Sequence, residues 1–202
     1  MRLNAAVREL QTGLWYWEAS HPDWTPGNPD DEGAKVMSYA IDDGGRLLLL
    51  DPLALPREID ELAADRETAI VLTCAWHERD TRSLAERLDA AVFVPSPEEG
   101  DPIEGRRLFS AGDRLPVGVS AFPGKDENDL VLWVESRRAL AVGDTLIDRG
   151  RGLQIPVDWL SEDVTREQVV AALHPLLELP VELVLPTHGG PTDRAALERA
   201  LS

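Results

Sequence analysis

The stretch from Cys74 to Asp80 carries the richest set of reactive side chains in the sequence: a thiol, an imidazole, two carboxylates and a guanidinium. It lies between a predicted strand and the start of a predicted helix. His77 and Asp80 are close enough along a helix start to bind one metal ion together. Two other interpretations stay open: Asp80 caps the helix, and Cys74 is a small buried residue with no base beside it.

Asp144 and His188 follow two other predicted strands. A strand-end aspartate usually caps a turn, which is also our interpretation of Asp51. Two glycines follow His188 and leave its ring approachable. Because metal ligands often come from distant loops, Asp144 and His188 together favour one shared site. With His77 and Asp80 they supply two imidazoles and two carboxylates, a set suited to Zn²⁺, Fe²⁺ or Mn²⁺.

Apolar runs that alternate with helical patterns predict parallel strands joined by helices. The run at 47–50 has no polar alternation, which indicates a strand buried on both faces. Asp-Asp-Gly-Gly at 42–45 predicts a hairpin, Thr-Arg-Glu-Gln at 165–168 fits a capping box that opens a helix, and 21–33 reads as a polar surface loop. Two β-rich halves, each ending in β/α units, predict two sheets stacked face to face with helices outside. We predict strands over 13–18, 34–41, 46–50, 69–74, 91–94, 107–109, 115–122, 130–135, 140–142 and 181–185, and helices over 56–66, 80–88, from 165 onward and over 192–201.

Composition narrows the class of protein. Twenty basic residues against 37 acidic ones give a net charge of −17. Such a surface repels phosphates, so nucleic acids and anionic membranes are disfavoured partners and a small molecule is expected. The one cysteine excludes an internal disulfide. The sequence has neither a long apolar run nor an export signal, so we expect a cytoplasmic protein with a single domain over 1–202 and leave its oligomeric state open.

Several of these motifs resemble the metallo-β-lactamase-fold superfamily, in the same order along nearly the whole chain. They are Asp51, the strand 69–73 with its following loop and helix, Pro-Gly at 123–124, Gly-Asp-Thr-Leu at 143–146 and Pro-Thr-His-Gly-Gly-Pro at 186–191. The resemblance implies an α/β fold with four layers, an αββα sandwich. It also implies a hydrolase with one or two metal ions in the active members.

The chain departs from the superfamily's Thr-His-x-His-x-Asp-His metal motif. Aligned on Thr73, the ligand positions hold other residues, and the histidine expected after Pro-Gly is Lys125. The family aspartate and final histidine are kept as Asp144 and His188. The resemblance therefore implies at most one metal ion. The replaced ligand positions hold Cys74, Trp76, Glu78 and Arg79.

Two functional hypotheses follow. The first is a divergent hydrolase of a small intracellular ester, thioester or lactone, with at most one divalent metal ion (zinc, iron or manganese) and with Asp80 and Asp144 also catalytic. The second is a non-catalytic protein without metal, in which Arg79 and Lys125 bind a small anion and neutralise Asp144 and Glu78. β-Lactam hydrolysis is disfavoured because imidazoles and an export signal are missing. The proposed metal ligands are His77, Asp80, Asp144 and His188.

Overall fold

The computed structural model describes residues 6–21, 24–25 and 34–202. Its first sheet runs in chain order from β1 to β7. Neighbours from β1 to β4 are antiparallel, and those from β4 to β7 are parallel. The strands are β1 (Arg8–Gln11), β2 (Leu14–Ser20), β3 (Lys35–Asp42), β4 (Arg46–Leu50), β5 (Glu67–Val71), β6 (Ala91–Pro95) and β7 (Arg107–Phe109).

The second sheet has the order β13-β12-β11-β10-β9-β8. Only β11 and β12 pair in parallel; its other neighbours are antiparallel. Each sheet is thus mixed, and each is built from one continuous half of the chain. The strands are β8 (Arg114–Leu115), β9 (Val119–Asp126), β10 (Asp129–Val134), β11 (Ala139–Ala141), β12 (Leu183–Leu185) and β13 (Thr192–Asp193).

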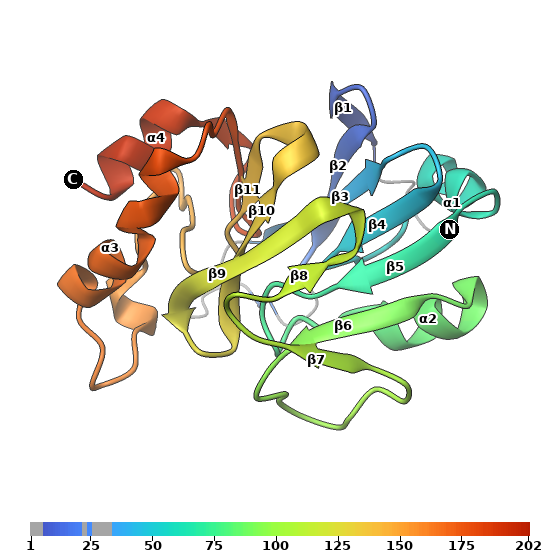
Figure 1. Cartoon of the computed structure of the whole chain (residues 1–202), viewed down its shortest axis with the longest axis horizontal. Coiled ribbons are helices and arrows are strands. Elements are labelled where there is room, and N and C mark those ends of the chain that lie inside the picture. Colours follow the sequence, from blue (N-terminus) through green and yellow to red (C-terminus); the bar gives the residue numbers. More distant parts are fainter. Residues whose placement is uncertain (1–5, 22–23, 26–33) are drawn as a thin grey trace.

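Helices cover the outer face of each sheet (Figure 1). Those of the first half, α1 and α2, pack on the first sheet, while α3 and α4 pack on the second. The predicted four-layer αββα sandwich with two mixed sheets is therefore confirmed. The helices are α1 (Arg57–Ala63), α2 (Thr81–Leu88), α3 (Arg166–Leu173) and α4 (Arg194–Ala200), with short 3-10 helices at Pro116–Gly118, Glu135–Arg137, Val157–Trp159 and His174–Glu178.

The run predicted to be buried on both faces is β4. Leu48 and Leu50 point into the core between the sheets, whereas Leu47 and Leu49 point toward the helices. Because side chains alternate along a strand, a strand between two apolar layers needs an uninterrupted apolar run. The capping box at 165–168 also forms, with Thr165 and Gln168 bonding each other's backbone N–H. β1 was not predicted, and most of the loop predicted over 21–33 lies outside the described residues.

Two hydrogen bonds join the sheets where the site lies. The N–H of Met37 on β3 donates to the carbonyl of Thr187 at 2.8 Å. The hydroxyl of Tyr39 donates to the carbonyl of Pro186 at 2.6 Å. They tie the first sheet to the segment that follows β12 in the second. Among the described residues no helix has both the length and the apolarity to cross a membrane.

Candidate functional site

Asp51 organises the part of the site that comes from the first sheet. It directly follows β4, and its carboxylate accepts hydrogen bonds from the backbone N–H of Thr73 at 2.9 Å and from the Thr73 hydroxyl at 2.5 Å. Burial alone would raise the pKa of Asp51, but the neighbouring His77, Arg79 and Thr73 lower it. Asp51 is therefore a buried carboxylate that fixes the loop after β5. Our interpretation of Asp51 as a simple turn cap missed this contact.

His77 lies buried between two carboxylates. Its Nδ1 is 3.3 Å from Oδ2 of Asp51, and its Nε2 is 3.3 Å from Oδ1 of Asp144. Burial would lower the pKa of His77, but the charges of Asp144 and Asp51 raise it to about 9. A carboxylate on one ring nitrogen turns the other nitrogen toward a fixed point, which is how metal-binding histidines are commonly oriented.

Asp144 and His188 bring the second sheet into the same site. Asp144 follows β11, and its Oδ1 lies 3.4 Å from Nε2 of His188, which follows β12. Burial would raise the pKa of Asp144, but His77, His188 and the indole N–H of Trp76 lower it far below its usual range. The structure thus brings together Asp144, His188 and His77, three of the four metal ligands that the sequence suggested.

Gly143 allows the turn that carries Asp144 to approach the loop after β5. Its φ is +51°, and a Cβ there would lie 2.6 Å from Oδ1 of Asp129, 2.9 Å from the Cys74 sulfur and 3.0 Å from the Thr73 hydroxyl. Real Cβ atoms do not come as close as the first two contacts. Only glycine combines this backbone conformation with this separation.

The surroundings of Asp144 fit a metal ion. Its Oδ1 is buried without a hydrogen-bond partner, although two imidazole nitrogens lie 3.3 and 3.4 Å away. These distances exceed the ~2.7–2.9 Å of a charge-assisted hydrogen bond. In a tetrahedral site with bonds of ~2.0–2.1 Å, neighbouring ligand atoms are about 3.3–3.4 Å apart. Ligand atoms of Cys74, His77 and Asp144 also lie within 4.8 Å of one another and could hold a metal ion.

Cys74 and Asp129 form a buried pair beside these ligands. The thiol donates to Oδ1 of Asp129 at 3.0 Å. Burial and the charge of Asp129 raise the pKa of Cys74 well above its usual value. Burial and then Asp144 also raise the pKa of Asp129, to about 7, against the opposing charge of Lys125. The sequence interpretation of Cys74 as an isolated buried residue missed this pair; its position in the resembled metal motif was the available signal.

Asp80 lies at the N-cap position of α2 without capping it. Its carboxylate accepts a hydrogen bond from the N–H of Ala54 at 2.7 Å instead. Among the described residues, no hydrogen bond or ion pair joins Asp80 to His77 or Asp144. The structure therefore does not bring Asp80 to the other three predicted ligands.

The predicted pairing of Arg79 and Lys125 with Asp144 and Glu78 is wrong. Arg79 has a left-handed backbone, and its guanidinium donates to the carbonyls of Asp51 at 2.8 Å and Met37 at 3.1 Å. Glu78 pairs with Arg82. The nearest acids to Lys125 are on its own strand and turn: the ammonium lies 2.6 Å from Asp126 and 3.5 Å from Asp129. Both predicted anion-binding cations already have partners.

Trp76 stands at the mouth of the site, with 39% of its surface exposed. Its indole N–H donates to Oδ2 of Asp144 at 2.8 Å. The ammonium of Lys125 lies 4.8 Å from the centre of the indole ring. The rings of Trp159 and His21 lie 5.5 and 5.7 Å from the ring of His188. His21, the first residue of the stretch predicted to be a polar surface loop, thus borders the site.

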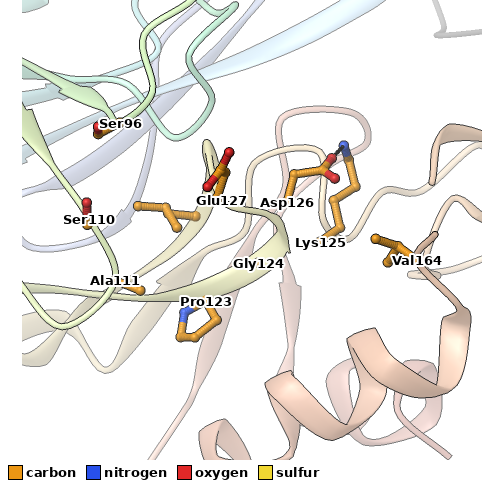
Figure 2. A pocket seen from close by; sticks show the side chains of 10 residues that line it. Ser96, Ser110, Ala111, Pro123, Gly124, Lys125, Asp126, Glu127 and Val164 are labelled. Carbon is orange, nitrogen blue, oxygen red and sulfur yellow. Dashed lines mark hydrogen bonds and ion pairs between the residues drawn. The ribbon is translucent and has the colours of Figure 1, made fainter. Parts of the chain in front are cut away.

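A pocket of about 510 Å³ adjoins Lys125 (Figure 2). Its volume falls in the range of small-molecule sites. The wall is partly apolar, with two serine hydroxyls and two carboxylates, and Figure 2 shows the ammonium of Lys125 beside the carboxylate of Asp126. Lys125 thus lines the pocket and also contacts the ring of Trp76. The lining residues are Ser96, Ser110, Ala111, Pro123, Gly124, Lys125, Asp126, Glu127, Leu130 and Val164.

Sequence comparison identifies no relative: no protein-family model matches the chain. No curated protein matches it either.

Solved structures do match, over nearly the whole chain. DIM-1 metallo-β-lactamase superposes with a TM-score of 0.73 at 13% identity, covering 98% of this chain and 96% of DIM-1. FIM-1 metallo-β-lactamase from Pseudomonas aeruginosa, in its mono-zinc form, gives 0.68 at 12% identity, covering 98% and 94%. A metallo-β-lactamase family protein from Thermus thermophilus gives 0.66 at 18% identity, covering 95% and 78%. At such identities the likeness establishes the fold: this chain has the metallo-β-lactamase fold.

Proposed function

We propose that the protein is a hydrolase that uses one divalent metal ion, held by His77, Asp144 and His188. The observation that carries the proposal is the buried Oδ1 of Asp144, which lacks a hydrogen-bond partner and lies 3.3 and 3.4 Å from two imidazole nitrogens. Two imidazoles and one carboxylate are a common ligand set of catalytic zinc and leave a fourth position open. When bound, such an ion supplies Lewis acidity toward a substrate carbonyl.

The residues around these ligands have positioning roles in this proposal. Asp51 holds Nδ1 of His77, so that Nε2 faces Asp144. Trp76 holds Oδ2 of Asp144 and leaves Oδ1 to face the imidazoles. Asp144 serves as a ligand and not as a proton acceptor, because its lowered pKa keeps it a carboxylate. Asp80 is not part of the proposed site, since its carboxylate bonds Ala54.

The proposed substrate is a small ester, thioester or lactone. The pocket beside Lys125, which none of the three proposed metal ligands lines, has room for such a molecule, and its wall offers apolar contacts and two hydroxyls. Its two carboxylates against one ammonium, which is already paired with Asp126, disfavour an anion. An uncharged carbonyl compound meets no such electrostatic cost.

Zinc titration of chelator-stripped protein tests the proposal. We expect isothermal titration calorimetry to give one zinc ion per chain, and His188→Ala to abolish binding. Asp80→Ala is the matched control and should bind zinc like the wild type. The zinc-loaded protein should hydrolyse at least one member of a panel of p-nitrophenyl esters, thioesters and γ-lactones, whereas His188→Ala should hydrolyse none.

Failure to bind zinc, or equal binding by His188→Ala, would overturn the proposal. His77 would then be an imidazolium held between Asp51 and Asp144 for structural reasons. Cys74→Ser tests the ligand set separately. It should keep one zinc ion if the thiol stays bonded to Asp129, and a lost ion would place Cys74 among the ligands instead.

A further inference from the structure

The two oxygens of Asp144 have different partners. Oδ1 faces the imidazoles of His77 and His188, while Oδ2 accepts the indole N–H of Trp76 at 2.8 Å. A carboxylate can accept on both oxygens, and in two-metal sites the ions lie only ~3.5–4 Å apart. What occupies the Oδ2 side therefore decides whether one cation or two can bind here.

Further potential ligands lie near Asp144. The sulfur of Cys74 is within 4.8 Å of Asp144 and bonds Oδ1 of Asp129 at 3.0 Å. Oδ2 of Asp129 is buried without a hydrogen-bond partner, 3.5 Å from the ammonium of Lys125. A thiol and two carboxylates are thus gathered in one buried region, a donor set that attracts divalent metals.

Positive charge and an N–H donor already occupy this region. Lys125 is buried, with 7% of its surface exposed, and its ammonium lies 4.8 Å from the centre of the Trp76 ring, within reach of a cation–π contact. It also faces the carboxylates of Asp126 and Asp129. A fixed ammonium repels a divalent cation strongly where water is excluded.

We propose that Trp76 and Lys125 together take the place of a second cation beside Asp144 and so limit the centre to one metal ion. The indole N–H occupies Oδ2, and the ammonium supplies the charge that balances Asp129. The inference rests on the proposed function, since it concerns the same metal site. Trp76 acts in it as a positioning residue, because its N–H fixes which carboxylate oxygen faces His77 and His188.

A cycle of variants tests this inference. Trp76→His replaces the indole by a ligand, and Lys125→Met removes the charge while keeping an unbranched side chain. We expect the wild type and each single variant to bind one zinc ion per chain. The double variant should bind two, measured by calorimetric titration and by metal analysis after gel filtration. Trp76→His with Lys35→Met, which removes an exposed lysine instead, is the matched control and should bind one.

Two zinc ions in the wild type, or one in a folded double variant, would overturn the inference. A wild type without zinc would instead overturn the proposed function. Should the double variant fail to fold, Trp76→Phe decides, because it keeps an aromatic ring but has no N–H to donate to Asp144. It should bind one zinc ion with roughly ten- to hundredfold weaker affinity, as expected when a residue that orients a ligand is lost. Unchanged affinity in Trp76→Phe would contradict the inference.

Discussion

Gly143→Ala is expected to lower the stability of the fold and to disturb the proposed metal site. The backbone of Gly143 has φ +51°, and the new Cβ would lie 2.6 Å from Oδ1 of Asp129 and 2.9 Å from the sulfur of Cys74. These two atoms bond each other at 3.0 Å, so neither can retreat without breaking a buried contact. The substitution therefore combines backbone strain with overpacking.

The expected loss of stability can be worked out by comparison with Gly105→Ala. Gly105 has a similar φ of +70°, but nothing lies within 4 Å of its Cβ position. Left-handed backbone costs alanine about 1–2 kcal/mol, and both variants share this cost. Overpacking adds roughly 1–3 kcal/mol, and loss of a hydrogen bond to a charged group adds about 1.5–3 kcal/mol. Gly143→Ala should thus be about 2.5–6 kcal/mol less stable than Gly105→Ala.

Urea unfolding of both variants, stripped of metal, measures this difference directly. At roughly 2–4 °C for each kcal/mol in a chain of this size, the melting temperatures should differ by ~5–24 °C. Zinc affinity should fall in Gly143→Ala alone, because the turn that carries Asp144 is displaced. If the two variants were equally stable, the close approach of this turn to Cys74 and Asp129 would not be a real constraint.

Three further outcomes are expected. The pKa of His77 is raised to about 9 in the folded protein, compared with ~6.5 in the unfolded chain. In metal-free protein this shift contributes about 3 kcal/mol to the free energy of unfolding. The contribution is complete below the unfolded pKa and is lost as the pH rises through 9. The stability difference between wild type and His77→Asn should therefore shrink from pH 6 to pH 10, and a constant difference would contradict the charge interaction. Arg79→Ala, which loses the bonds to two carbonyls, should unfold about 1–3 kcal/mol more easily while still binding one zinc ion; a lost ion would place Arg79 in the metal site. Thr165→Ala breaks the capping box and should cost about 1 kcal/mol in chemical denaturation, whereas an unchanged midpoint would mean that tertiary packing alone holds α3.

The layers of sheets and helices could be predicted because the sequence patterns that indicate them involve residues close together in the chain. The uninterrupted apolar run of β4, the turn after β3 and the capping box of α3 each depend on neighbours in the chain. β1 escaped prediction because four residues of mixed polarity make a strand only by pairing with β2.

The site was predictable only in part, for a physical reason. Asp144 and His188 could be identified because each lies in the loop that follows a strand. Cys74 and Asp129 could not be paired in advance, because they are 55 residues apart and meet through an isolated bridge between segments. Lys125 has its partners on the same turn, so a charge-balance argument that placed it against Asp144 was wrong.

Each sheet of the sandwich comes from one half of the sequence, and this has a consequence for how the proposed metal site forms during folding. The first sheet ends at Phe109 and the second begins at Arg114, so a single short connection separates the two sets of strands. Asp51 and His77 belong to the first half, and Asp144 and His188 to the second. Neither half alone contains all the proposed ligands, so zinc binding with high affinity would show that the sheets have docked. A bound ion would in turn act as a reversible cross-link between them, worth about 4 kcal/mol at a free concentration ~1,000 times its dissociation constant.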